Sequence, residues 1–122
     1  MPPQLPAILL IEKDEITLEL YQRELSKSFT VLAFTNLNGV LETLSTAEIR
    51  AVIIEPETSA GEGWELIDAI QAASADRHIP LIVCSTRDEC NRNSGKGIAS
   101  YLTKPVLPKT LREKTFEIVN QQ

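Results

Sequence analysis

Five short apolar runs recur along the chain, and each stops abruptly at polar residues. They span Ala7–Ile11, Phe29–Phe34, Ala51–Ile54, Ile79–Cys84 and Ile98–Leu102. Continuous apolar runs of this length, rich in β-branched residues, are typical of strands buried on both faces of a parallel sheet. The pattern therefore predicts five buried, parallel strands.

Apolar residues at helical spacing follow most of these runs. Asp14 is a candidate N-cap for a first helix that ends near Lys27. Its expected core-facing stripe comprises Ile16, Leu18, Leu20, Tyr21 and Leu25.

Three further helices are expected. Asn36 or Asn38 opens one that passes through Val40, Leu41 and Leu44 towards Ile49. Another begins at Trp64, with Leu66, Ile67 and Ile70 on one side, and the last begins near Pro108 and carries Leu111, Phe116, Ile118 and Val119. Residues 87–97 are polar and lack apolar periodicity, so a helix there is short or frayed at most.

Strands that alternate with helices through short connections require right-handed crossovers and a parallel sheet covered on both faces. We expect an α/β, three-layer (βα)5 doubly wound domain over residues 7–122. Residues 1–6, with three prolines, are expected to form a disordered lead-in.

Charge and hydropathy narrow the functional classes. The net charge of −5 and the pI near 4.9 disfavour nucleic-acid binding, which needs a basic surface. No apolar run approaches the roughly 20 residues of a membrane span, and the N-terminus lacks the regions of a secretory signal. We expect a cytoplasmic protein that binds other proteins, with no nucleic-acid or membrane partner.

Chemically active side chains follow four of the five runs. Glu12 and Lys13 come after the first, Glu55 after the third, Ser85 after the fourth, and Lys104 shortly after the fifth. Parallel strands bring their carboxyl ends to one edge of the sheet, which is where ligands bind in open α/β folds. These residues are therefore expected to converge.

This set, in its order and spacing, resembles the CheY-like receiver domain of two-component response regulators over essentially the whole chain. The resemblance implies a flavodoxin-like sheet with strand order 2-1-3-4-5. It places Glu55 at the phosphoacceptor position, Glu12 at the first acidic position of the metal pocket, and Ser85 and Lys104 where the phosphoryl oxygens are bound. Tyr101 matches the switch aromatic.

Three departures from that pattern concern phosphoryl transfer. The acceptor is Glu55 instead of Asp, Lys13 replaces the second acidic residue, and Pro56 removes the amide that follows the acceptor. The chain thus resembles a pseudo-receiver, and no catalytic residue, enzymatic activity or cofactor is expected. A weak Mg²⁺ site through Glu12 and Glu55 is the most that the residues would allow.

Several functional alternatives stay open at this point. Glu55 either mimics a phosphorylated acceptor by pairing with Lys104, alone or together with Ser85, or forms a purely structural ion pair with Lys13 and Lys104. A conventional receiver would instead accept phosphate from a histidine kinase. A small flavodoxin-like enzyme or nucleotide binder is a further possibility, although no G-x-G-x-x-G or Walker loop is present.

The resemblance also implies the kind of partner. We expect signalling proteins, either a histidine kinase or an output protein, to dock on a face made by residues 87–97, Ser100–Tyr101 and Lys109–Ile118. The oligomeric state does not follow from the sequence.

Overall fold

A computed structural model describes residues 5–36, 39–55, 62–73, 79–85, 98–103 and 105–121, without the side chains of residues 62–66, 73, 85 and 98. The elements are β1 (Ala7–Ile11), α1 (Glu15–Leu25), β2 (Thr30–Phe34), α2 (Val40–Thr46), β3 (Ile49–Ile54), α3 (Glu62–Ala73), β4 (Leu81–Ser85), β5 (Ile98–Thr103) and α4 (Pro108–Asn120). The expectations for residues 1–4 and for a helix within 87–97 lie outside the described residues.

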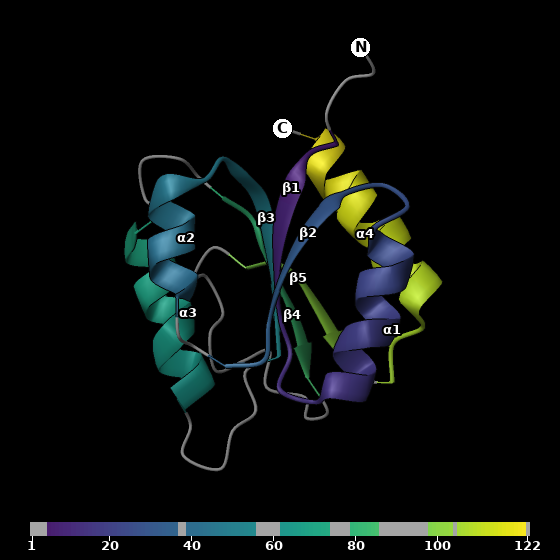
Figure 1. Ribbon diagram of the computed structural model, residues 1–122, viewed down its shortest axis with the longest axis horizontal. Coiled ribbons are helices and arrows are strands. Elements are labelled where there is room, and N and C mark those ends of the chain that lie inside the picture. Colours follow the sequence, from purple (N-terminus) through teal and green to yellow (C-terminus); the bar gives the residue numbers. More distant parts are fainter. Residues whose placement is uncertain are drawn as a thin grey trace.

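The five strands form one parallel sheet in the order β2-β1-β3-β4-β5, as the sequence predicted. Figure 1 shows α1 and α4 together on one face of the sheet and α2 and α3 on the other. The fold is therefore a three-layer, doubly wound α/β sandwich. In the described part of the chain, no helix has the length and apolar character needed to cross a membrane.

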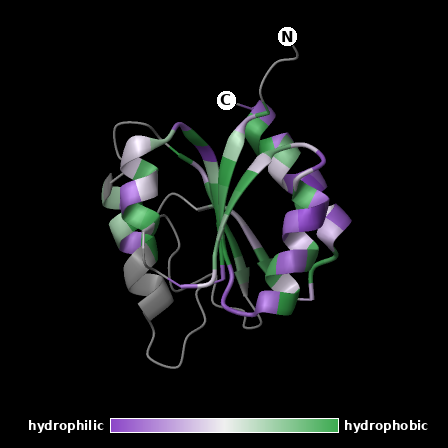
Figure 2. Cartoon of the chain, viewed as in Figure 1, coloured by the Kyte–Doolittle hydropathy of each residue, from purple (hydrophilic) through white to green (hydrophobic). Residues whose placement is uncertain are grey.

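Alternate residues of each central strand enter two separate cores. In β1, Ile8 and Leu10 face the α1–α4 layer, whereas Leu9 and Ile11 face the α2–α3 layer. β3 and β4 divide in the same way, and Figure 2 shows the resulting apolar strands between helices with polar outer faces. Because both faces are buried, these strands read as continuous apolar runs in the sequence.

The predicted stripe on α1 was partly wrong. Tyr21 and Leu25 are buried, but the Ile16 and Leu20 side chains are 73% and 49% exposed. At about 100° per residue, nine positions rotate Ile16 by roughly 180° from Leu25, so one helix face cannot hold both. Asp14 caps the helix as predicted, since its carboxylate accepts a hydrogen bond from the Thr17 amide at 3.0 Å.

The second helix is shorter than predicted. Gly39 is its N-cap, in place of Asn36 or Asn38, and Asn38 lies outside the described residues. Gly39 has a φ of 83°, a left-handed conformation that a side chain disfavours. The helix ends at Thr46, and Ile49 begins β3, where it pairs with Ala7.

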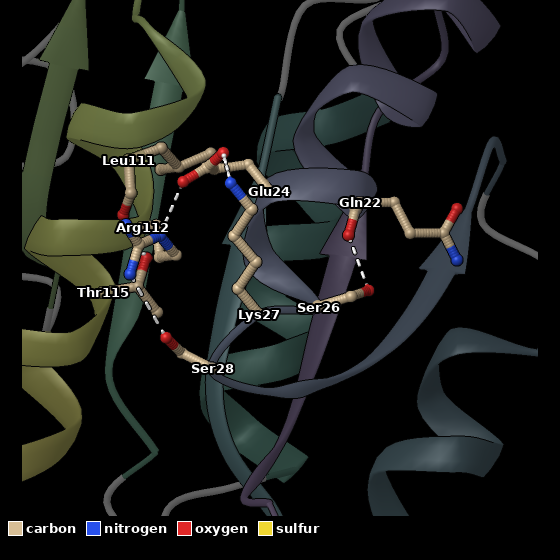
Figure 3. Close-up of polar contacts among 8 residues, drawn as sticks. All are labelled: Gln22, Glu24, Ser26, Lys27, Ser28, Leu111, Arg112 and Thr115. Atoms are coloured by element: carbon tan, nitrogen blue, oxygen red, sulfur yellow. Dashed lines mark hydrogen bonds and ion pairs between the residues drawn. The ribbon is translucent and has the colours of Figure 1, made fainter.

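Polar side chains fasten α1 to α4 (Figure 3). The Arg112 guanidinium donates to the Glu24 carboxylate at 2.7 Å, and the Lys27 ammonium donates to the other Glu24 oxygen at 3.0 Å. Hydrogen bonds from Lys27 and then Arg112 hold the pKa of the Glu24 carboxyl below its usual value. In α4, Phe116 is 54% exposed, whereas Leu111, Ile118 and Val119 are buried.

Candidate functional site

The pairing of β1 with β3 builds the centre of the candidate site. Ile11 and Ile54 are register partners at the carboxyl ends of these strands, and the Glu55 amide donates to the Ile11 carbonyl at 3.0 Å. On the other side of β1, the Glu12 amide donates to the Phe34 carbonyl at 3.0 Å. These bonds hold Glu12 and Glu55 at adjacent strand ends, as the sequence predicted.

Glu12 is an acid enclosed by the fold, because only 2% of its surface is exposed. Its Oε2 atom accepts a 3.3 Å hydrogen bond from the Asp14 amide, immediately before α1. A buried carboxylate requires such polar partners to offset its lost hydration. By contrast, Lys13 is exposed and Glu55 is half-buried.

The outer strands bring the remaining predicted positions to the same edge only in part. The backbone of Ser85 ends β4 opposite Thr103 of β5, but the Ser85 side chain is outside the described part of the structure. Lys104 is also outside the described residues, and its role stays a prediction. Tyr101 is paired with Val83 and is half-buried against the α2–α3 core, which leaves its switch role untested.

Tyr21 makes a polar contact in this region that the sequence did not predict. Its ring is buried, with 5% exposure, and its hydroxyl donates to the Val106 carbonyl at 3.1 Å. Burial, followed by the nearby Cys84 and Glu12 charges, raises the pKa of the Tyr21 hydroxyl to about 12. A buried tyrosine hydroxyl usually has a hydrogen-bond partner, so the predicted core-facing position of Tyr21 could have indicated such a bond.

The described side chains do not assemble a metal site. Among them, no group of three or more His, Cys, Asp and Glu residues is arranged to hold a metal ion. The expectation of at most a weak Mg²⁺ site through Glu12 and Glu55 stays a prediction.

The raised pKa of Tyr21 makes a prediction about alkaline stability. The folded protein favours the neutral phenol, whose pKa is 10 in the unfolded chain and about 12 in the fold. The stability that this difference contributes is complete below pH 10 and is lost as the pH rises through about 12. The free energy of unfolding should therefore fall more steeply between these pH values in the wild type than in Tyr21→Phe. Urea titrations at each pH measure the difference, and Tyr101→Phe, which keeps Tyr21, should retain the steep fall. Parallel pH profiles for the wild type and Tyr21→Phe would contradict this assignment.

Comparisons with solved structures agree on the fold. No family model matches the chain, and no curated protein sequence matches it. Among solved structures, a CheY-like response regulator receiver domain protein from Methanospirillum hungatei JF-1 has a TM-score of 0.82 at 20% identity, over 97% of this chain and 96% of its own. A response regulator from Thermotoga maritima has a TM-score of 0.80 at 21% identity, over 95% and 98% of the two chains.

A third similar structure is the BeF3-activated DrrB receiver domain. Its TM-score is 0.78 at 16% identity, over 96% of this chain and 99% of that one; DrrB is an OmpR/PhoB homologue from Thermotoga maritima. At such low identities the likeness concerns the backbone, and it agrees with the strand order found here. The chain therefore has the fold of the CheY-like receiver domains of response regulators.

Proposed function

We propose that this chain is a receiver-like signalling domain that works without phosphorylation, through protein–protein interaction, and is not an enzyme. The observation that carries the proposal is the pairing of β1 with β3, which holds Glu55 beside the buried Glu12 while the neighbouring Lys13 is exposed. By the resemblance to receiver domains, Glu55 takes the position at which a receiver carries its acceptor aspartate.

The longer side chain argues against phosphoryl transfer at this position. One extra methylene carries the Glu55 carboxylate outward by about one C–C bond, ~1.5 Å. In-line transfer depends on near-attack geometry and loses efficiency with a misplacement of this size. Lys13 and Pro56 add to the argument, because they remove an acidic metal ligand and a backbone donor.

Electrostatics favour a lysine as the partner of Glu55. Two carboxylates at adjacent strand ends repel each other when both are ionised, and a nearby cation offsets that repulsion. Lys104 follows β5 in the sequence, whereas the described Lys13 is exposed to solvent. We propose that Glu55 pairs with Lys104 and keeps the domain in one signalling conformation; a pair that is purely structural is the competing account.

Glu55→Gln tests this pairing directly. Removing the carboxylate should lower the pKa of the Lys104 ammonium, because the charge that favours its protonated form is gone. Titration of the lysine side chains by NMR, with isotope-labelled protein, measures this value. Glu57→Gln is the matched control, since it removes an acid two positions further along the sequence and should leave the Lys104 pKa unchanged.

Partner binding separates the mimic from the structural pair. If Glu55 sets the signalling conformation, Glu55→Gln should weaken the binding of an identified partner at least tenfold, or about 1.4 kcal/mol. Undiminished binding, together with a lowered Lys104 pKa, would leave only the structural pair. An unchanged pKa would contradict the pairing itself.

A conventional receiver is the alternative within the same fold. It would become labelled by acetyl phosphate and Mg²⁺, and retardation in a Phos-tag gel would reveal it. The BeF3-activated state named for the DrrB receiver domain makes beryllofluoride a second suitable probe. The flavodoxin-like enzyme or nucleotide binder is the weaker alternative, and a flavin spectrum in the purified protein would support it.

We further propose that a signalling partner, a histidine kinase or an output protein, docks on the face that includes α4 and Ser100–Tyr101. Arg112 is an unsuitable probe of this face, because it also bonds to Glu24 and Ser28 of the α1 region. Lys109 is exposed on the first turn of α4 and makes a cleaner one.

Charge reversal at Lys109 tests this docking face. Lys109→Glu should reduce partner binding at least tenfold without changing the melting temperature, because an exposed charge contributes little to stability. Arg23→Glu is the control, since Arg23 is an exposed cation on α1. Equal binding by Lys109→Glu and the wild type would exclude this part of α4, and an equal loss in both variants would indicate a general charge effect.

A further inference from the structure

The hydrogen bond between Tyr21 and Val106 links two distant parts of the candidate site. The residues are 85 positions apart, and the bond joins the middle of α1 to the connection between β5 and α4. Val106 comes two residues after Lys104 in the sequence. Its side chain is partly buried against the same core as the Tyr21 ring, so both the hydroxyl bond and apolar packing act at this point.

Two prolines restrict the backbone of the connection, so a hydrogen bond to Val106 also restrains its neighbours. Pro105 and Pro108 have φ angles fixed by their rings, and Pro108 also restricts Leu107 to extended conformations. Leu107, which precedes Pro108, has the extended angles φ −66° and ψ 138°. These restrictions leave fewer torsions of residues 105–108 free to absorb a displacement of the Val106 carbonyl.

The same helix also supports the acidic half of the site. Asp14 caps α1 and donates its amide to Glu12, and Glu12 lies near enough to Tyr21 for its charge to raise the tyrosine pKa. α1 therefore contacts the buried acid near its first turn and the lysine-bearing connection through Tyr21. A shift of this helix would move both together.

We propose that Tyr21 is a positioning residue of the site: its hydroxyl holds the Val106 carbonyl and thereby fixes the connection that follows Lys104 in the sequence. The inference rests on the proposed function in one respect, namely that Lys104 pairs with Glu55. Tyr21 itself makes no contact with a ligand in this account and acts through the backbone of the connection.

Tyr21→Phe is the decisive variant, because it keeps the buried ring and removes only the hydroxyl. Glu24→Gln is the matched control. It weakens the ion pair between Glu24 of α1 and Arg112 of α4 and leaves Tyr21 intact. NMR of labelled protein provides three readouts, namely the Val106 carbonyl ¹³C shift, the Lys104 amide shift and the pKa of the Lys104 ammonium.

In Tyr21→Phe, the Val106 carbonyl and the Lys104 amide should both shift. The Lys104 pKa should move at least half of the way from the wild-type value to that of Glu55→Gln. Glu24→Gln should leave all three unchanged, even though it lowers the melting temperature. A merely structural role for Tyr21 would lower stability in both variants without this selective effect on Lys104.

The outcomes distinguish failure of this inference from failure of the pairing. If Glu55→Gln lowers the Lys104 pKa but Tyr21→Phe does not, the pairing stands and the positioning role is overturned. If Glu55→Gln has no effect on the Lys104 pKa, the pairing fails. The chemical shift of the Lys104 amide then tests the positioning role by itself. A shift of that amide in Tyr21→Phe but not in Glu24→Gln supports positioning, and no shift overturns it.

Discussion

The pairing of β1 with β3 is the constraint on which the rest of the site depends. It forms because both strands are apolar on two faces and can be buried only at the centre of a sheet that is covered by helices on each side. Its last backbone bond, from Glu55 to Ile11 at 3.0 Å, then brings two carboxylates to neighbouring strand ends. Burial of apolar strands, a general folding force, thus determines where the charged groups meet.

The charged groups of this edge differ in their surroundings. Glu12 is enclosed and accepts the Asp14 amide, whereas Glu55 is half-buried and Lys13 is exposed. An enclosed carboxylate is costly unless its partners are fixed, so the turn before α1 supports the acid as well as the helix. In the proposed function this arrangement replaces a changeable phosphoryl group with a permanent negative charge.

The sequence was sufficient for the order and type of the elements, and less so for the faces of the helices. Buried parallel strands are recognisable because every residue in them is apolar, and the strand order agrees with the resemblance to receiver domains. Ile16 and Leu20 are apolar but exposed, because the angular spacing of the helix turns them away from the face that buries Leu25. Gly39 was missed as a cap because a side-chain oxygen was expected there.

The site was predictable at the ends of the strands and not between distant segments. Glu12 and Glu55 could be located because each directly follows a strand whose neighbours are set by the topology. The bond from Tyr21 to Val106 depends on how α1 rotates against the β5–α4 connection, which no local pattern encodes. Long-range side-chain contacts of this kind require the packed structure.

The most direct measurement of the central claim is a titration with Mg²⁺ and beryllofluoride, followed by the fluorescence of Trp64, which lies nine residues after Glu55 in the sequence. Beryllofluoride takes the place of a phosphoryl group on an acceptor carboxylate and needs the divalent cation beside it. A domain that signals without phosphorylation should give a flat response to both reagents while its circular dichroism shows it to be folded. A saturable change that requires both reagents would demonstrate a working phosphoryl site at Glu55 and would contradict the account.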